Sequence, residues 1–347
     1  IIQGDKMKKI IALILVLLVV ACSKKTEETE KVLYLFNWSD YMPQEILDEF
    51  YEETGIKVIM DSYASNEEMY TKIAAGSSSY DIIFPSADYQ EIMIKQDMLE
   101  KIDKTKIPNI AQLNKEIISK IDFDSNLDFT IPYAVGATGI AVNKKYVKDY
   151  KKSYEIFEDA KLKGRMTLLD DGREVLTSAL AYNGLDPRTS DDVSLNKAKE
   201  TILKWKNNIV KFDSESFGKG FANEEFWVVQ GYYENIVAQI DEANRGDFDF
   251  FIPEKGGTMY IDSMVIPKGA KNIENAYIFM NYIHKPEVYA KIVDYFEIPS
   301  INDGAEKVRK TKAPYTLSEL NKTTLLKDLG SALEKHNYIW NEIKSSN

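Results

Sequence analysis

The sequence predicts a two-lobed α/β protein in which each lobe is a mostly parallel sheet flanked by helices. Strand-like and helix-like segments alternate from residue 32 onward, a pattern typical of parallel sheets with helices on both faces. Two apolar runs, at 134–143 and 262–267, have the character of strands that cross between lobes and form a hinge. Removing an expected signal segment leaves 326 residues (347 − 21), which is enough for two domains that each bury a core.

The first lobe opens with an apolar, β-prone run at 32–36 that suits a buried strand. Pro43 stands where a first helical turn starts, and Gly55 is a typical helix end. The buried face of this helix comes from four side chains at helical spacing: Ile46, Leu47, Phe50 and Tyr51. A second strand follows at 56–60.

The next unit of the first lobe is a helix and then a third strand. Ser65 and Glu68 have the spacing of a capping box, and residues 81–84 are again strand-like. Ligands of parallel α/β sheets bind at the carboxyl ends of strands. The loops at 37–41 and 85–89 lie at those ends, so they are the first candidates for a binding site.

The second lobe repeats the alternation beyond the first crossing. Its expected elements are strands at 166–169 and 248–252, and helices at 174–182 and 194–209. The return strand leads to helices at 275–284 and 287–294, and a C-terminal helix is expected from about Thr324. The lobe boundaries that follow are 32–134 plus 263–300 for lobe I, and 135–262 plus 301–347 for lobe II.

The N-terminal segment has the features of an export signal. Two lysines follow Met7, and the apolar run at 10–21 is too short for a stable membrane span. The run ends at Cys22, the only cysteine, in a sequence that resembles the bacterial lipoprotein box. We therefore interpret 1–21 as upstream residues plus a lipoprotein signal peptide, and 22–31 as a charged, lipidated tether.

This interpretation places the protein on the periplasmic or extracytoplasmic face of a bacterial membrane, held by its lipid. An ordinary secretory signal with an incidental cysteine, or an uncleaved anchor, are the alternatives. No other segment has the length and apolarity of a membrane span.

Composition excludes several classes of function. Without residues 1–21 the net charge is −13 (−11 − 2), which argues against nucleic acid because phosphate binding needs a basic face. The charge is compatible with a cationic ligand, although many exported proteins are acidic for solubility alone. One cysteine and two histidines, His284 and His336, argue against a disulfide, a thiolate or multi-histidine metal site and a histidine-based nucleophile. We expect no metal and no cofactor.

Six segments carry a resemblance to a known family. They are LYLFNWSDYMP (33–43), ETGIKVIMDSYASNEEMYTKI (53–73), YDIIFPSADY (80–89), IPYAVGATGIAVN (131–143), LLDDGREVL (168–176) and PEKGGTMYIDSMVIPKGAKN (253–272). In this order the chain resembles the spermidine/putrescine-binding proteins of bacterial transporters, which are type II periplasmic binding proteins. The resemblance implies a monomer that captures a polyamine between two lobes and delivers it to the permease of an ABC transporter.

A polyamine needs carboxylates for its ammonium groups and aromatic walls for its methylenes. The resemblance assigns these roles by position. Trp38 is a stacking ring, Ser39 a hydroxyl, and Asp40 and Tyr41 further pocket residues. Ser86 matches a serine that bonds an amine, and Asp88 replaces a tyrosine of spermidine-type members. The acidic pair for one end of the ligand is Asp171 and Glu174, and the remaining candidates are Ser214, Glu234, Tyr260 and Asp262.

The chain also departs from the family pattern. No tryptophan stands near 231–233, where Tyr232 or Tyr233 could supply the ring, and the sequence does not decide between them. Ile298 replaces a pocket tyrosine, and Leu326 a glutamine. These differences leave the choice of polyamine open.

Three other functions compete with this interpretation. In a related family, two adjacent tyrosines bind ferric iron, and this chain has such a pair in Tyr232 and Tyr233. The carboxylates could serve as acid and base in an enzyme, but no nucleophile–base motif accompanies them. A surface lipoprotein with a degenerate cleft is the third alternative, because several pocket residues of the family are missing.

Overall fold

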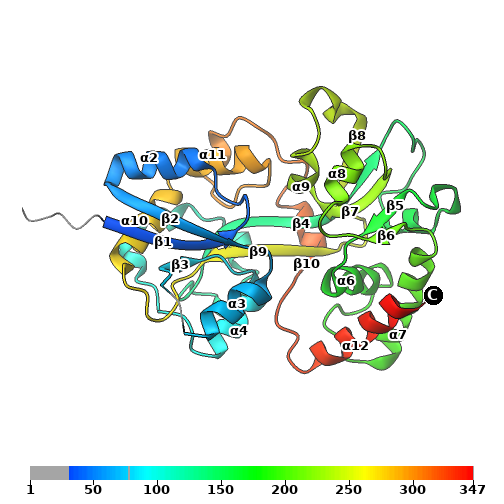
Figure 1. Ribbon diagram of the computed structural model, residues 1–347, viewed down its shortest axis with the longest axis horizontal. Coiled ribbons are helices and arrows are strands. Elements are labelled where there is room, and N and C mark those ends of the chain that lie inside the picture. The colour runs from blue at the N-terminus through cyan, green and yellow to red at the C-terminus, as the bar shows by residue number, and fades with distance from the viewer. Residues whose placement is uncertain (1–30, 77–78, 347) are drawn as a thin grey trace, which may run out of the picture.

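The computed structural model describes residues 31–76 and 79–346, and Cys22 with the rest of the expected signal and tether up to residue 30 lies outside the described residues. The described elements form two groups side by side (Figure 1). We call the group with β1–β3 lobe I and the group with β5–β8 lobe II. The expected two-lobed α/β architecture is therefore present.

Lobe I is built on a parallel three-stranded sheet in the order β2-β1-β3. Its strands are β1 (Lys31–Trp38), β2 (Ile56–Tyr63) and β3 (Ile82–Ile83). Its helices are α2 (Gln44–Thr54), α3 (Asn66–Ala74), α4 (Ala87–Lys95), α5 (Lys115–Ile118), α10 (Ile273–Ile283) and α11 (Pro286–Phe296). Because β1 and β3 are parallel neighbours, Trp38 and the 85–89 loop meet at one edge of the sheet.

Local sequence signals explain the ends of these elements. Gly55 has φ +68° and ends α2, as expected for a left-handed helix terminus. The hydroxyl of Ser65 accepts the backbone N–H of Glu68, which completes one half of the predicted capping box. The carboxylate of Glu68 accepts the backbone N–H of Ala64 rather than that of Ser65.

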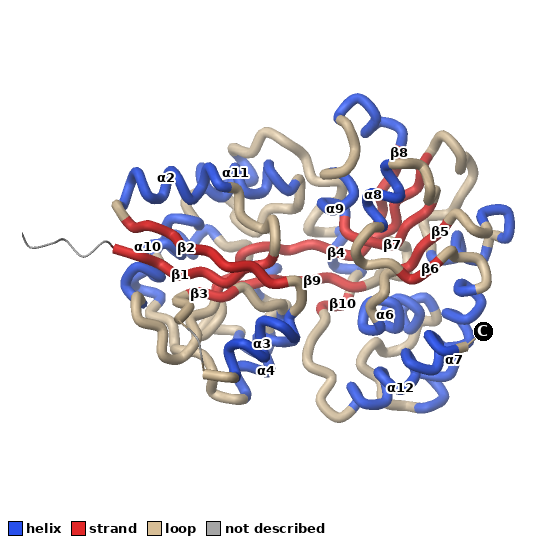
Figure 2. Tube along the Cα trace, viewed as in Figure 1, coloured by secondary structure: helices blue, strands red, loops and turns tan. Residues whose placement is uncertain are grey.

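Two long strands run through both lobes. β4 (Ile131–Asn143) is buried along its whole length and pairs antiparallel with β9 (Thr258–Met264). Figure 2 shows these strands as the continuous link between the two groups of elements. At the end of β9 and just after it, antiparallel bridges join Asp262 to Ser86 and Val265 to Ile83, so the return strand reaches the lobe I sheet.

Lobe II surrounds the far half of β4. Its strands are β5 (Met166–Leu168), β6 (Lys211–Phe212), β7 (Val228–Tyr232), β8 (Phe248–Phe251) and β10 (Thr324–Leu325). Its helices are α6 (Gly172–Tyr182), α7 (Asp192–Lys206), α8 (Phe217–Ala222), α9 (Tyr233–Val237) and α12 (Ala332–Ser345). The pairs β5–β6, β5–β7 and β9–β10 are parallel, whereas β4 is antiparallel to β7, β8 and β9.

Several element predictions were wrong in detail. Residues 324–325 form β10 beside β9, and the C-terminal helix starts only at Ala332, after Gly330 with φ +52°. The return strand begins at Thr258, four residues before its predicted start, because Thr258 and Met259 pair with β10 and β9 pairs with β4 from Met259 onward. β7 was not predicted. Among the residues that the structure covers, no helix is long and apolar enough to cross a membrane.

Candidate ligand-binding site

One face of β9 organises the candidate site. Thr258, Tyr260 and Asp262 are spaced two apart, so their side chains point to the same side of the strand. At about 3.3 Å per residue, Thr258 and Asp262 are about 13 Å apart along the strand. Each contacts a different polar group, and together they form a row from lobe II toward lobe I.

Asp262 stands at the lobe I end of this row. Its Oδ2 accepts a 2.9 Å hydrogen bond from the Tyr41 hydroxyl, while its Oδ1 is buried without a hydrogen-bond partner. Burial raises the pKa of Asp262 to about 7, although the nearby Ser86 side chain and the bond from Tyr41 oppose the shift. The site thus holds a carboxyl group whose ionised form lacks a compensating cation.

Tyr260 and Glu234 occupy the middle of the row. The Tyr260 hydroxyl donates to Glu234 Oε1 over 2.7 Å, and Glu234 Oε2 is buried with no partner. Burial raises the pKa of Glu234, and the bond from Tyr260 partly offsets this. Gly136 faces Tyr260 across the β4–β9 pair, and a Cβ there would lie 2.3 Å from the tyrosine oxygen. The absence of a side chain at Gly136 therefore leaves the space that the Tyr260 ring occupies beside β4.

Glu174 marks the lobe II end. Its Oε2 accepts hydrogen bonds from the hydroxyls of Thr138 (2.8 Å) and Thr258, and its Oε1 accepts one from Tyr232 over 3.1 Å. Burial, followed by the negative charge of Asp171, raises the pKa of Glu174 to about 7 against these three bonds. Glu174 is held in place more firmly than Asp262 because both its oxygens have donors.

Asp171 is the N-cap of α6. Its Oδ1 accepts the backbone N–H groups of Arg173 (2.8 Å) and Glu174 (3.1 Å), which orients the first turn of the helix. Burial raises the pKa of Asp171, and these backbone bonds lower it. The three-residue spacing of the acidic pair thus has a capping role in the structure, beside any contact with a ligand.

Asp88 lies across from α6, on α4 of lobe I. Its Oδ2 is 3.4 Å from Arg173 Nη1, and its Oδ1 accepts the backbone N–H of Tyr89. Burial raises the pKa of Asp88 to about 6, with the charge of Arg173 opposing the shift. Arg173 also donates to the carbonyl of Lys327. The carboxylate of Asp88 therefore already has a cationic partner, which is itself held in place by a second contact.

The Trp38 loop contributes rings at the carboxyl end of β1. The Trp38 indole N–H donates to the carbonyl of Phe84 over 2.8 Å, and its ring packs at 4.7 Å against Tyr63. Ser39 and Asp40 are exposed, and Asp40 has φ +55°. The backbone N–H of Ser39 donates to the carbonyl of Tyr63, and neither residue forms a hydrogen bond with Asp262, Glu234 or Glu174.

Ser214 lies apart from the row. It is exposed in the turn after β6, where Asp213 accepts the backbone N–H groups of Glu215 and Ser216. Ser86 lies in the site through its bridge to Asp262, and its hydroxyl makes no helix-capping bond.

The two neighbouring tyrosines, Tyr232 and Tyr233, have different partners in the structure. Tyr232 donates a hydrogen bond to Glu174, and its ring packs edge-on against Tyr260 with the ring centres 5.9 Å apart. The Tyr233 hydroxyl donates instead to Glu297 on lobe I, 3.1 Å away. The two phenols point to different carboxylates and do not converge on one position, which a shared iron ion would require. The described residues hold no group of three or more His, Cys, Asp or Glu arranged to bind a metal.

Sequence reasoning missed the two aromatic residues that support Tyr41. The Tyr133 hydroxyl donates to the Tyr41 carbonyl over 2.8 Å, and the two rings meet edge-to-face at 5.5 Å. Phe296 packs against the other side of Tyr41 at 5.2 Å. Tyr133 lies in the quoted IPYAVGATGIAVN segment, so its position at the crossing was the available signal.

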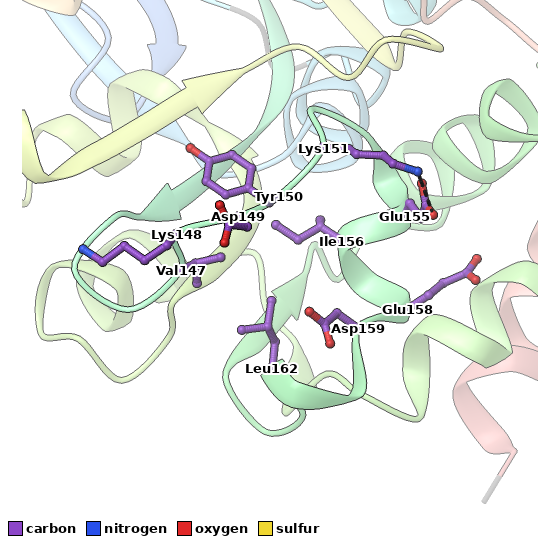
Figure 3. A pocket seen from close by; sticks show the side chains of 10 residues that line it. All are labelled: Val147, Lys148, Asp149, Tyr150, Lys151, Glu155, Ile156, Glu158, Asp159 and Leu162. Carbon is purple, nitrogen blue, oxygen red and sulfur yellow. Dashed lines mark hydrogen bonds and ion pairs between the residues drawn. The ribbon is translucent and has the colours of Figure 1, made fainter.

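A cavity of about 650 Å³ lies elsewhere, on lobe II between β4 and β5 in the chain (Figure 3). It is lined by side chains from residues 147–162, including Asp149 and Tyr150. None of the predicted site residues lines it. Along β9, by contrast, buried carboxyl groups have oxygens without a hydrogen-bond partner, and aromatic rings border them. These groups suit a ligand with cationic ends and an apolar middle.

Comparison with known proteins identifies the class. The model of the family described as bacterial extracellular solute-binding protein matches residues 45–317. The chain therefore belongs to the bacterial extracellular solute-binding proteins.

Individual relatives agree with this assignment. The chain is 33% identical over 339 residues to the putrescine-binding periplasmic protein SpuD of Pseudomonas aeruginosa, covering 91% of this chain and 92% of that one. It is 34% identical over 285 residues to the spermidine/putrescine-binding periplasmic protein of Escherichia coli, covering 81% and 80%. The crystal structure of the TpPotD lipoprotein of Treponema pallidum superimposes with a TM-score of 0.88 at 39% identity, covering 90% and 99%. Its similarity confirms the expected type II binding-protein fold.

Proposed function

We propose that this protein captures a polyamine, putrescine or spermidine, between its two lobes. The observation that carries the proposal is the pair of buried carboxyl oxygens without partners, Asp262 Oδ1 and Glu234 Oε2, on either side of the Tyr260 contact. A buried carboxylate is costly unless a cation or donor compensates it. An ammonium group bound there would donate hydrogen bonds to both of these oxygens and compensate their charge. The relatives named for putrescine and spermidine support the same ligand class.

The geometry along β9 supports the following roles. Asp262 and Glu234 bind one ammonium group, and Glu174 with Asp171 receives the other. Trp38, Tyr41, Tyr260 and Tyr232 cover the methylenes between them, in a region where each ring is already fixed by a hydrogen bond. Ser86 supports the Asp262 end. Asp88 is held by Arg173, Ser39 and Asp40 belong to the exposed loop after Trp38, and Ser214 lies too far from the row to take part.

Capture is followed by delivery to the permease of an ABC transporter, with the protein acting as a monomer that binds but does not transform its ligand. Lipid attached at Cys22 would hold the receptor at the periplasmic or extracytoplasmic face of a bacterial membrane, on a tether formed by 22–31. A relative described as a lipoprotein supports the anchor.

The test is calorimetric titration with a panel of polyamines, after unfolding and refolding to remove carried-over ligand. Asp262→Asn and Trp38→Ala should each weaken polyamine binding at least tenfold, about 1.4 kcal/mol or more, without loss of folding. Asp48→Asn, on the exposed side of α2, is the matched control and should bind normally. Unchanged affinity in both site variants would exclude this site.

The alternatives have distinct signatures. Ferric iron on tyrosines would give a visible charge-transfer band, and the divergence of Tyr232 and Tyr233 argues against it. An enzyme would consume added polyamine, which chromatography would detect. Absence of any small-ligand binding would favour a surface lipoprotein with a degenerate site.

A further inference from the structure

Glu297 joins the two lobes at a point away from β4 and β9. It follows the last residue of α11 in lobe I, and both its carboxylate oxygens reach lobe II. Oε1 pairs with Arg245 Nη1 at 2.5 Å, and Oε2 accepts the Tyr233 hydroxyl at 3.1 Å. Arg245 lies in the 3-10 helix η6 (Glu242–Asp247), and Tyr233 begins α9. In Figure 1, α9 and α11 lie on the same side of β4.

The backbone of Glu297 is unusual for its residue type. It has φ +54° and ψ +31°, the left-handed conformation that glycine favours at helix ends. Glycine would satisfy the helix end with less strain but would carry no carboxylate across to lobe II. Observed strain of this kind is a reason to look for a function of the side chain.

The lobe II side of this contact is one residue from the proposed ligand site. Tyr233 and Glu234 are the first two residues of the short helix α9. Tyr233 packs at 5.4 Å against Phe250 of β8 and bonds Glu297, while Glu234 bonds Tyr260 on β9. A ligand that fixes Glu234 therefore also fixes the turn from which Tyr233 reaches lobe I.

We propose that Glu297, Arg245 and Tyr233 form a latch that stabilises the closed arrangement of the lobes and slows ligand release by holding α9. The latch itself is independent of what the ligand is, and only its effect on release rests on the proposed function. Glu297 acts as a positioning residue, since it reaches the ligand only through α9. Opening the lobes requires this contact to break, so a stronger contact makes opening slower.

The test separates the rates of ligand association and dissociation by stopped flow with spermidine. Glu297→Gln, which keeps the backbone conformation and removes the charge, should raise the dissociation rate about fivefold and leave association nearly unchanged. Arg245→Met should do the same, and the double variant should be no worse than either single variant. Additive effects, or an unchanged dissociation rate in both single variants, would overturn the latch.

Two further variants distinguish a latch from general stability. Glu297→Gly should unfold at an equal or higher temperature than the wild type, because glycine accepts the left-handed conformation, yet it should still release ligand faster. Asp97→Asn is the matched control, since Asp97 is also left-handed (φ +56°) at a helix end and pairs with Lys268 within lobe I. It should not alter release. A Glu297→Gly protein that is less stable but releases normally would contradict the proposal.

A failure of the proposed function is recognised separately. If the wild type binds no polyamine, small-angle scattering of the ligand-free proteins tests the latch directly. Glu297→Gln should then increase the radius of gyration at low salt, and the wild type should expand toward the same value at high salt. Equal radii for the two proteins at low salt would refute the latch.

Discussion

Asp262 shows how one residue can combine a structural role with the binding role that we propose for it. The Tyr41 hydroxyl and the bridge to Ser86 fix its position, but they satisfy only one of its two oxygens. Asp88 and Glu234 add negative charge nearby, which further disfavours its ionised form. The ligand-free protein is therefore expected to keep Asp262 partly protonated near neutral pH, and a cationic ligand would favour its ionisation.

The raised pKa of Asp262 predicts a pH-dependent stability. Its folded pKa of about 7 lies above the ordinary 3.8, so between about pH 4 and pH 7 the folded state binds more protons than the unfolded state. Stability from this group is therefore present at low pH and is lost as pH rises through 7. The rise in the pKa of Asp262 from 3.8 to about 7 corresponds to at most about 4 kcal/mol in the free energy of unfolding.

Asp262→Asn should remove this dependence. Urea unfolding of the ligand-free protein at pH 5 and pH 8 measures it, and the variant should gain stability relative to the wild type on going to pH 8. Other titrating groups, such as His284, cancel in the comparison. An identical difference between the two proteins at both pH values would contradict the raised pKa.

Some of these residue roles could be anticipated from the sequence and others could not. Three-residue spacing places Asp171 and Glu174 on one turn, and the structure has both there. The choice between Tyr232 and Tyr233 depends on where β7 ends, and that strand gave no clear signal. The contact of Glu297 with Tyr233 could not be predicted from the sequence, because it depends on how α11 of lobe I approaches α9 of lobe II.

At the scale of elements, the pairing of β4 with β9 positions the site. Ala134, Gly136 and Thr138 alternate on the face of β4 that lies beside Asp262, Tyr260 and the Glu174 carboxylate. Small side chains on β4 leave room for large polar side chains on β9. The IPYAVGATGIAVN run is thus both the crossing strand and the floor of the site.

Gly136→Ala tests this arrangement. The new Cβ would lie 2.3 Å from the Tyr260 oxygen, so the ring must shift and its hydrogen bond to Glu234 would be disturbed. We expect a loss of about 1–3 kcal/mol in stability, typical of overpacking, together with at least tenfold weaker polyamine binding. Calorimetry of folded protein measures the second effect. Gly246→Ala, which has open space around the new atom, is the control. Normal affinity in Gly136→Ala would show that the position of Tyr260 does not matter.

The elements themselves were predicted best where apolar periodicity and capping residues agreed. α2 and α3 start and end near their signals at Pro43, Gly55 and Ser65. The prediction of a helix from Thr324 failed because residues 324–325 add to the edge of β9, and edge pairing of two residues leaves no periodic pattern. Strand β9 was placed too late for a similar reason, since TMYIDSM mixes polar site residues with its apolar positions.

The whole molecule is held together by more than its crossing strands. Lobe contacts occur on one side between Asp88 and Arg173 and on the other between Glu297 and Arg245. Both lie outside the β4–β9 pair, on elements that approach each other only when the lobes are together. The sequence predicted two lobes and two crossings, because these follow from the order of strands, but not the contacts that set how closely the lobes meet.

The crossing strands also predict how the protein unfolds. All thirteen residues of β4 are buried, and a single hydrophobic cluster includes Leu33 and Phe50 of lobe I with Leu176 and Trp205 of lobe II. A core that is continuous through β4 and β9 couples the lobes, so we expect one cooperative transition although the protein has two lobes. Differential scanning calorimetry should give a van't Hoff enthalpy equal to the calorimetric enthalpy. Polyamine at a hundredfold excess over its Kd should stabilise the whole transition by about 2.7 kcal/mol. Two separated transitions, of which the ligand moves only one, would show that the lobes unfold independently and that β4 does not couple them.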